Sequence, residues 1–392
     1  MRSFGASGVI AATAIGIVCV LVLDSMLLGH NWAQAWSMFG LPAVLPPFLD
    51  MHTVTDAAGC ARLGIDVYVV TDCDPMHRTY NYPPVWLLLG RLGVNGASTV
   101  WLGSISGIGF ILSLLWLNRG LPAAAGFLSA VVLLSPAVLL CIERGNTDMV
   151  IFILLVAVCA LLAKDRWLNT FLAACLAGLA IVLKLYPVFV AGIAARLSRR
   201  TALIAFGCAL LTGLYVLALG DTFQMIMRNT PRPIIGAFGA PVFFKAFGLP
   251  YLSLVIAACV LAAAAISLRI VRVGPQVLPL LEGFHGIAFI VGAGVYCGTF
   301  AFFSSWSYRL IFLIMCLPQI HSWLTAEDSK GTRAIGWLLF GAILAVCWLT
   351  SHSAFTLLPH AAGWTLFTVL TATLFLSALR TSPVSLVGRA QA

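Results

Sequence analysis

The chain has 392 residues, of which 61% are hydrophobic and only 9% are charged, whereas a soluble globular protein has about 25% charged residues. This composition excludes a soluble protein, so the usual estimate of one domain per roughly 150 residues does not apply. We therefore expect one polytopic membrane domain over residues 1–392. The formal charge of +9 comes from 22 Lys and Arg against 13 Asp and Glu, and in such a chain it reports topology rather than a nucleic-acid surface.

Apolar runs predict an all-α bundle of about twelve transmembrane helices, within a range of about 10 to 13, because a bilayer core needs about 20 helical residues. The first run follows Arg2 and has no small-residue cleavage site after it, so we interpret it as an uncleaved span. The runs lie near residues 8–29, 97–117, 121–141, 147–163, 168–183, 186–196, 201–219, 250–268, 277–302, 309–323, 334–351 and 361–379.

The basic residues sort unevenly between the two sides of this bundle. With the N-terminus inside, the cytoplasmic loops hold 13 of the 22 basic residues, as the positive-inside rule expects. These are Arg2, Arg119, Lys164, Arg166, Arg196, Arg199, Arg200, Arg269, Arg272, Lys330, Arg333, Arg380 and Arg389. This orientation places two long loops, residues 30–96 and 220–249, on the extracytoplasmic side. Nine basic residues remain on that side, where function is one candidate explanation: Arg62, Arg78, Arg91, Arg144, Lys184, Arg228, Arg232, Lys245 and Arg309.

The 11 cysteines contain no CxxC pair and no cluster of zinc spacing. Most lie in apolar segments, where Cys behaves as a small hydrophobic residue. Only Cys60 and Cys73 share a polar loop, so a disulfide between them is one option. No group of His, Asp and Glu has metal spacing either, so we predict no metal site and no cofactor, and dependence on a divalent ion stays open.

Five polar clusters converge on the extracytoplasmic face. Ionisable groups at the edge of a bilayer are costly unless they face water, a partner or a ligand. Lys184 is the strongest functional candidate, because it ends an apolar run directly before Leu-Tyr-Pro, where the helix must break. The clusters are Asp50-Met51-His52, Tyr80-Asn81-Tyr82-Pro83-Pro84, Glu143-Arg144-Gly145-Asn146-Thr147-Asp148, Lys184-Leu185-Tyr186-Pro187 and Ser304-Ser305-Trp306-Ser307-Tyr308-Arg309.

Three of these clusters also have a plain structural explanation. Asp50 opens a helix-like run and can serve as its N-cap, and Pro83-Pro84 can start the short helix that follows. Arg309 follows the aromatic residues Trp306 and Tyr308, and at such a position it can extend to the membrane interface. Three acids of the first loop lie in turn-rich sequence, where we expect them to be solvated: Asp66, Asp72 and Asp74.

The order of the motifs resembles glycosyltransferase family 87 (DUF2029), a branch of the GT-C membrane glycosyltransferases. The resemblance covers about residues 8–320, and a later segment, Trp306-x-Tyr308-Arg309-Leu310, also looks like bacterial relatives of this group. The motifs are Asp50, Gly64-x-Asp66-x-Tyr68, Tyr80-x-Tyr82-Pro83-Pro84, Gly145-Asn146-x-Asp148, Ala177-Gly178-Leu179-Ala180 and Lys184-Leu185-Tyr186-Pro187.

This resemblance implies a GT-C-like bundle with a long first extracytoplasmic loop that carries the catalytic Asp. It implies a hexosyltransferase that takes a sugar, with mannose as one option, from a polyprenyl-phosphate donor to a lipid or glycan acceptor. The reaction would invert the anomeric carbon at the periplasmic face of a bacterial inner membrane. The position that matches the family's base is Asp50, and Asp56 is the fallback.

The residues fit that chemistry. A carboxylate can take the proton of the acceptor hydroxyl, and a departing polyprenyl phosphate needs fixed positive charge rather than a general acid. Arg binds phosphate through two parallel hydrogen bonds and Lys acts as a point charge. The predicted donor-phosphate ligands are Lys184, Arg144 and Arg309. The predicted substrate-binding residues are His52, Tyr80, Asn81, Tyr82, Asn146, Asp148 and Tyr186.

The main alternative is a transporter or flippase of a lipid-linked sugar. Transporters tend to have halves related by symmetry and polar residues near the middle of the membrane. Here the polar residues gather at one face, and only Glu282 and His285 approach the interior of a span. A membrane scaffold without chemistry is a third interpretation with no positive support. The distribution of polar residues therefore favours an enzyme.

Overall fold

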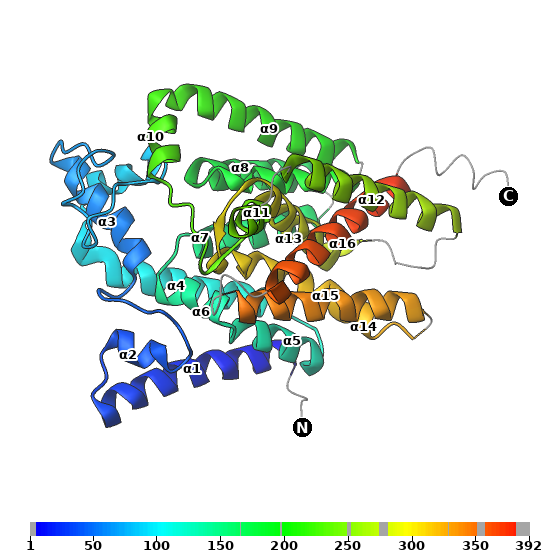
Figure 1. Ribbon diagram of the computed structural model, residues 1–392, viewed down its shortest axis with the longest axis horizontal. Helices are drawn as coiled ribbons and strands as arrows, with labels where there is room; N and C mark the ends of the chain where they lie inside the picture. The colour runs from blue at the N-terminus through cyan, green and yellow to red at the C-terminus, as the bar shows by residue number, and fades with distance from the viewer. Residues whose placement is uncertain are drawn as a thin grey trace. The chain divides into compact units, whose positions relative to one another are not determined.

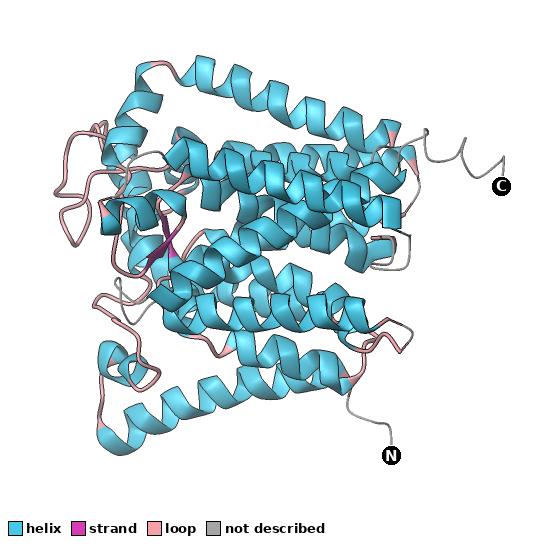
Figure 2. Cartoon of the chain, turned by 45° about the vertical axis from the view of Figure 1, so that its right-hand side comes forward, coloured by secondary structure: helices cyan, strands magenta, loops and turns pink. Residues whose placement is uncertain are grey.

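The computed structural model describes residues 5–164, 166–196, 198–248, 252–273, 281–327, 329–350 and 357–381. Arg2 and Arg389, which contributed to the predicted orientation, lie outside these ranges, as do residue 249 of the second long loop and the starts of the runs at 250 and 277. The described chain is almost entirely helical, and Figure 2 shows a short pair of strands as the exception. The chain divides into two compact units, which we describe separately.

Unit 1 comprises residues 1–154, 178–185 and 211–232. In it, α1 (Ala6–Leu28) packs against α4 (Thr99–Leu117) and α5 (Ala123–Leu133), and α3 (Leu49–Arg62) packs against η1 (Pro84–Leu92), η2 (Gly96–Ser98) and α4. Pro136 starts α6 (Pro136–Glu143) at a bend of 67° from α5, as expected of a residue that cannot continue the preceding helix. The remaining elements are α2 (Trp32–Ser37) and α10 (Asp221–Asn229), and Figure 1 labels the α-helices of the unit.

Three helices contribute residues to both units: α7 (Asp148–Leu162), α8 (Trp167–Leu183) and α9 (Arg199–Leu219). Unit 2 is built around α13 (Gly283–Phe302), which packs against η3 (Tyr186–Arg196), η4 (Ser307–Cys316) and α16 (Leu357–Thr381). Its two strands, β1 (Ala237–Phe238) and β2 (Ser305–Trp306), pair antiparallel, with Ala237 opposite Trp306. The other elements of unit 2 are α11 (Ala240–Phe247), α12 (Leu252–Val273), α14 (Leu317–Leu324) and α15 (Lys330–Leu349).

The prediction of an all-α, multi-pass membrane protein is confirmed in its coarse form. Among the described residues, seven helices are long and apolar enough to cross a membrane, or eight if the bent α5–α6 pair counts as one span. Helices α9 and α12 bury only 11% of their apolar windows, which suits contact with lipid. These seven helices correspond to the first, second, seventh, eighth, ninth, eleventh and twelfth predicted runs.

The count of about twelve spans is not confirmed. The run at 121–141 is the bent pair, and the runs at 147–163 and 168–183 form helices of 15 and 17 residues. The run at 186–196 is an 11-residue 3-10 helix, and the run at 309–323 divides between η4 and α14. Apolar composition detects burial in protein and burial in lipid alike, so the shorter runs are not by themselves evidence of membrane crossings.

Candidate functional site

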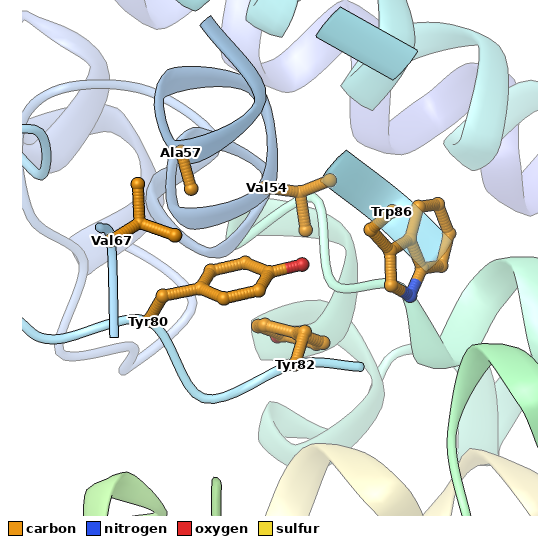
Figure 3. Close-up of a cluster of buried hydrophobic side chains, with 6 residues drawn as sticks. All are labelled: Val54, Ala57, Val67, Tyr80, Tyr82 and Trp86. Atoms are coloured by element: carbon orange, nitrogen blue, oxygen red, sulfur yellow. The ribbon is translucent and has the colours of Figure 1, made fainter. Parts of the chain in front are cut away.

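The first long loop folds around α3. Tyr80 lies under Val54 and Ala57 of this helix in a buried cluster that Figure 3 shows together with Val67, Tyr82 and Trp86. A disulfide joins Cys60, near the end of α3, to Cys73, so the option left open by the sequence is realised. The cluster and the disulfide hold α3 against the residues that follow it in the loop.

The turn between α6 and α7 meets the first turn of α3. The backbone carbonyl of Arg144 accepts hydrogen bonds from the amides of Asp50 (2.9 Å) and Met51 (3.3 Å). Gly145 has a positive φ of 58°, a backbone region that glycine enters at little cost. Phe48, and not Asp50, occupies the N-cap position of α3. The carboxylate of Asp50 is therefore not needed as a cap and faces the turn.

Asn146 joins Asp50 to Lys184. Its Nδ2 donates to Oδ2 of Asp50 at 2.6 Å, and its Oδ1 accepts from Nζ of Lys184 at 3.2 Å. Asn146 is fully buried, so both bonds form away from bulk water, where an unpaired amide would be costly. The same Oδ1 accepts from the amide of Asp148 at 2.8 Å.

Lys184 also forms an ion pair with Asp148. Its helix, α8, ends at Leu183, as the Leu-Tyr-Pro sequence predicts, and Nε1 of Trp86 donates to the Leu183 carbonyl at 2.9 Å. Asp148 is fully buried, and Nζ of Lys184 lies 5.1 Å from the centre of the Tyr82 ring. Burial and then the negative charges of Asp50 and Asp148 raise the pKa of Tyr82, so its hydroxyl stays protonated at neutral pH.

The structure adds Arg78 and Asp74, which the sequence did not predict as site residues. Nε and Nη2 of Arg78 bind the Asp74 carboxylate at 3.0 and 2.9 Å, and Nη1 lies 3.5 Å from Oδ1 of Asp50. The expectation that Asp74 is solvated is wrong, because this residue is 6% exposed and also accepts from Oγ1 of Thr53 at 3.0 Å. The only sequence signal was the unexplained excess of basic residues on the predicted outer face, which includes Arg78.

The ionisation of this added pair is set by the two partners. Burial opposes the charged form of Asp74, but the hydrogen bonds and charge of Arg78 hold the pKa of the carboxyl below its ordinary value. Burial likewise opposes the charge of Arg78, and Asp74 and Asp50 outweigh that effect and raise its pKa. We call the six linked residues Asp50, Asp74, Arg78, Asn146, Asp148 and Lys184 the polar network.

His52 and Asp56 lie on a different side of α3. Nδ1 of His52 is 2.8 Å from Oδ2 of Asp56 and 3.3 Å from Oγ1 of Thr99 in α4. A Cβ on Gly96 would collide with Oδ1 of Asp56, so this carboxylate is packed against the start of η2. The structure therefore places the fallback base in the contact between α3 and its neighbours, apart from the polar network.

Arg144 is paired with a buried acid. Its Nε lies 3.1 Å from Oε2 of Glu143, and its Nη2 donates to the Pro42 carbonyl at 3.2 Å. Glu143 is fully buried and accepts from Nε1 of Trp32 at 3.1 Å. The guanidinium predicted to bind phosphate thus neutralises a buried carboxylate beside the turn.

Two predicted substrate-binding residues of the first loop differ in their surroundings. Tyr80 is 2% exposed, and its hydroxyl donates to the Pro83 carbonyl at 3.1 Å, which makes it part of the core under α3. Asn81 is half-buried, and its side chain has no hydrogen bond within the part of the chain that the structure describes. Asn81 therefore keeps amide groups that a ligand can bind.

Arg309 and Tyr186 belong to unit 2. The guanidinium carbon of Arg309 lies 4.4 Å from the centre of the Tyr186 ring, and Nη1 donates to Oγ of Ser305 at 2.9 Å. Nearby in the chain, the rings of Trp306 and Tyr308 stack at 6.4 Å. A guanidinium on an aromatic face, next to a hydroxyl, is an arrangement that binds anions or sugar hydroxyls.

Known proteins provide a separate line of support for a glycosyltransferase. Residues 142–256 match the family model Mannosyltransferase (PIG-M), which describes GT-C-type glycosyltransferases. The matched segment contains Asn146, Asp148 and Lys184 of the polar network. No curated protein and no solved structure matches the chain. The family-model match supports a membrane glycosyltransferase and names mannosyl transfer as the activity of that family.

Within the described ranges there is no group of three or more His, Cys, Asp and Glu side chains placed to hold a metal ion.

Proposed function

We propose that the protein is a multi-pass glycosyltransferase of a bacterial inner membrane. It moves a hexose, with mannose favoured, from a polyprenyl-phosphate donor to a lipid or glycan acceptor at the extracytoplasmic face, with inversion. One observation carries the proposal: three residues in the segment that matches a mannosyltransferase family lie in one polar network with Asp50, the carboxylate that the resemblance to family 87 implies as the base.

The charge balance of the network supports Asp50 as that base. Asp148 and Asp74 each contact a cation at 2.9 Å or less, whereas the nearest cationic nitrogen to Asp50 is 3.5 Å away. Three carboxylates against two cations leave one negative charge, and Asp50 is the least compensated of the three. A carboxylate in that state can take the proton of an acceptor hydroxyl in a partly desolvated site.

The disulfide supports the orientation. Disulfides persist in oxidising compartments such as the periplasm and are rare in the cytosol. The bond between Cys60 and Cys73 lies in the first long loop, beside Asp74. A loop on the extracytoplasmic side would meet the polyprenyl-phosphate donor there.

Transfer of labelled mannose from a synthetic polyprenyl-phosphate-mannose to a membrane extract tests the proposal. We expect purified wild-type protein to transfer the sugar, and Asp50→Asn to lower the rate by about 10²- to 10⁴-fold, the usual contribution of a general base. The amide is isosteric with the carboxylate, so the melting temperature should stay close to that of the wild type.

Asp56→Asn is the matched comparison, because it makes the same chemical change in the same helix. We expect the loss in Asp50→Asn to exceed the loss in Asp56→Asn by at least about tenfold. A larger loss in Asp56→Asn would move the base to Asp56. Absence of transfer by folded wild-type protein from any polyprenyl-phosphate-hexose would contradict the proposed activity and favour a flippase.

A further inference from the structure

Arg78 has a donor group that its structural role does not use. Its Nε and Nη2 bind the Asp74 carboxylate, and Nη2 also contacts Oγ1 of Thr53 at 2.6 Å and the Leu49 carbonyl at 2.9 Å. Within the described chain, the hydrogen-bond partner of Nη1 is Asp50 alone, at 3.5 Å, which is longer than the usual range of about 2.7–3.2 Å. The three other groups fix the guanidinium and aim Nη1 at the side of Asp50.

This part of the network is also the accessible part. The side chain of Arg78 is 34% exposed, compared with 12% for Asp50 and 6% for Asp74. Part of the Arg78 side chain is therefore open to solvent while Asp74 and Thr53 hold the guanidinium in place. This exposed side chain lies beside the carboxylate that we propose as the base.

The charge of the network selects the kind of ligand. Its three carboxylates and two cations already carry one net negative charge, and the charge of Arg78 is shared with Asp74. A phosphate at Nη1 would add negative charge beside Asp50, and like charges disfavour each other at this range. A neutral hydroxyl has no such cost.

The distances fit a hydroxyl. An oxygen that accepts from Nη1 at about 2.9 Å and donates to Oδ1 at about 2.7 Å has ordinary hydrogen-bond lengths on both sides. Those two lengths close a triangle over the 3.5 Å between Nη1 and Oδ1. The same separation that is too long for a good direct ion pair thus suits one bridging oxygen.

We propose that Arg78 and Asp50 together bind the acceptor hydroxyl, with Arg78 donating to its oxygen and Asp50 accepting its proton. This proposal rests on the proposed function. In the reaction the hydroxyl O–H bond breaks and its proton moves to Oδ1 of Asp50. The oxygen forms a bond to the anomeric carbon of the donor sugar. The bond from that carbon to the phosphate oxygen breaks, and the polyprenyl phosphate leaves with the electron pair.

Steady-state kinetics of Arg78→Gln and Arg78→Lys test the assignment. Loss of a hydrogen bond from a charged donor corresponds to about a 10- to 100-fold loss in rate. We expect that loss in transfer to the acceptor by Arg78→Gln, a partial recovery in Arg78→Lys, and an unchanged KM for the donor. Arg91→Gln is the matched control, because Arg91 is an exposed basic residue of the same loop. A raised donor KM in Arg78→Gln would assign Arg78 to the phosphate and overturn the proposal.

Binding of methyl α-mannoside, followed by saturation-transfer NMR on protein in nanodiscs, gives a readout without turnover. We expect wild-type protein and Arg91→Gln to bind the glycoside and Arg78→Gln to bind it about tenfold more weakly. No binding by the wild type, or equal binding by Arg78→Gln, would overturn the hydroxyl site. Binding that depends on Arg78 without any sugar transfer would support the hydroxyl site and reject the proposed transferase. Melting temperatures identify any variant whose loss comes from unfolding.

Discussion

The two ends of the polar network differ in how tightly they hold their charges. At the closed end, Lys184 and Asp148 form an ion pair, with the carboxylate fully buried and the lysine side chain 10% exposed. At the open end, Arg78 lies 3.5 Å from Asp50 and its side chain is 34% exposed. A buried pair cannot exchange its partner without a large desolvation cost, whereas an accessible guanidinium can. The closed end therefore fits a structural role and the open end fits ligand binding.

Loss of the ion pair between Lys184 and Asp148 at the closed end is expected to give the largest fall in stability. Lys184→Met leaves the Asp148 carboxylate buried without its cation, a change that costs about 3–5 kcal/mol when one partner of a buried pair is removed. We expect a fall in the melting temperature of purified protein and a fall in the yield of monodisperse protein. The double variant Lys184→Met with Asp148→Leu should recover most of the loss, because no uncompensated charge remains.

Arg91→Gln is the control for the loss of one basic side chain without burial. If Lys184→Met melts like the wild type, the pair is not tightly coupled and the contrast between the two ends fails. If the double variant is as unstable as the single one, Lys184 stabilises the fold through Asn146 rather than through Asp148.

The disulfide stabilises the loop that carries Asp74 and Arg78, and its removal is expected to give the second-largest loss of stability. Cys60 and Cys73 are 13 residues apart, and a cross-link that closes a loop of about 15 residues contributes about 3 kcal/mol in the chain-entropy account. We expect the Cys60→Ser, Cys73→Ser double variant to melt at a lower temperature and to be cleaved faster by protease in the first loop.

Cys175→Ser, at an exposed cysteine of α8, is the control for loss of a thiol. A reductant should lower the melting temperature of the wild type towards that of the double variant and leave the double variant unchanged. Equal proteolysis of the oxidised and reduced wild type would show that the buried cluster around Tyr80 holds the loop without the disulfide.

The sequence singled out the residues of the closed end more clearly than Arg78 and Asp74 of the open end, although it assigned Lys184 to the donor phosphate rather than to Asp148. Asn146, Asp148 and Lys184 interrupt apolar runs at one membrane face, where polar residues need partners, and the structure brings them together with Asp50. Arg78 and Asp74 lie in turn-rich sequence without periodicity. Their pairing depends on backbone geometry and on Thr53, four residues into α3 from Leu49, and no composition rule encodes such a contact.

The same limit applies to the two acids of α3. Asp50 and Asp56 are both acidic residues of the first loop, and spacing alone does not rank them. The structure separates them by their neighbours: Asn146 and Arg78 contact Asp50, whereas His52 contacts Asp56. Partners that come from distant parts of the chain, rather than the local motif, therefore decide which carboxylate is a candidate base.

The smallest expected effect is a pH dependence at the open end. The pKa of Asp74 is held below its ordinary value by Arg78 despite burial, so folding favours the ionised carboxylate. That contribution is fully present above the unfolded pKa of about 3.9 and is lost as the pH falls through the lower, folded pKa. We expect wild-type protein to melt above Asp74→Asn at neutral pH, and the difference to shrink below about pH 4.

Melting curves at a series of pH values in one detergent measure this difference. Asp72→Asn is the control, because the Asp72 side chain is 87% exposed and lies two residues away. Its melting temperature should follow the wild type at every pH. A gap between wild type and Asp74→Asn that stays constant into the acid range would mean that the Asp74 charge does not stabilise the fold. The guanidinium of Arg78 would then be held by Thr53 and the Leu49 carbonyl, and the open end would not need its second carboxylate.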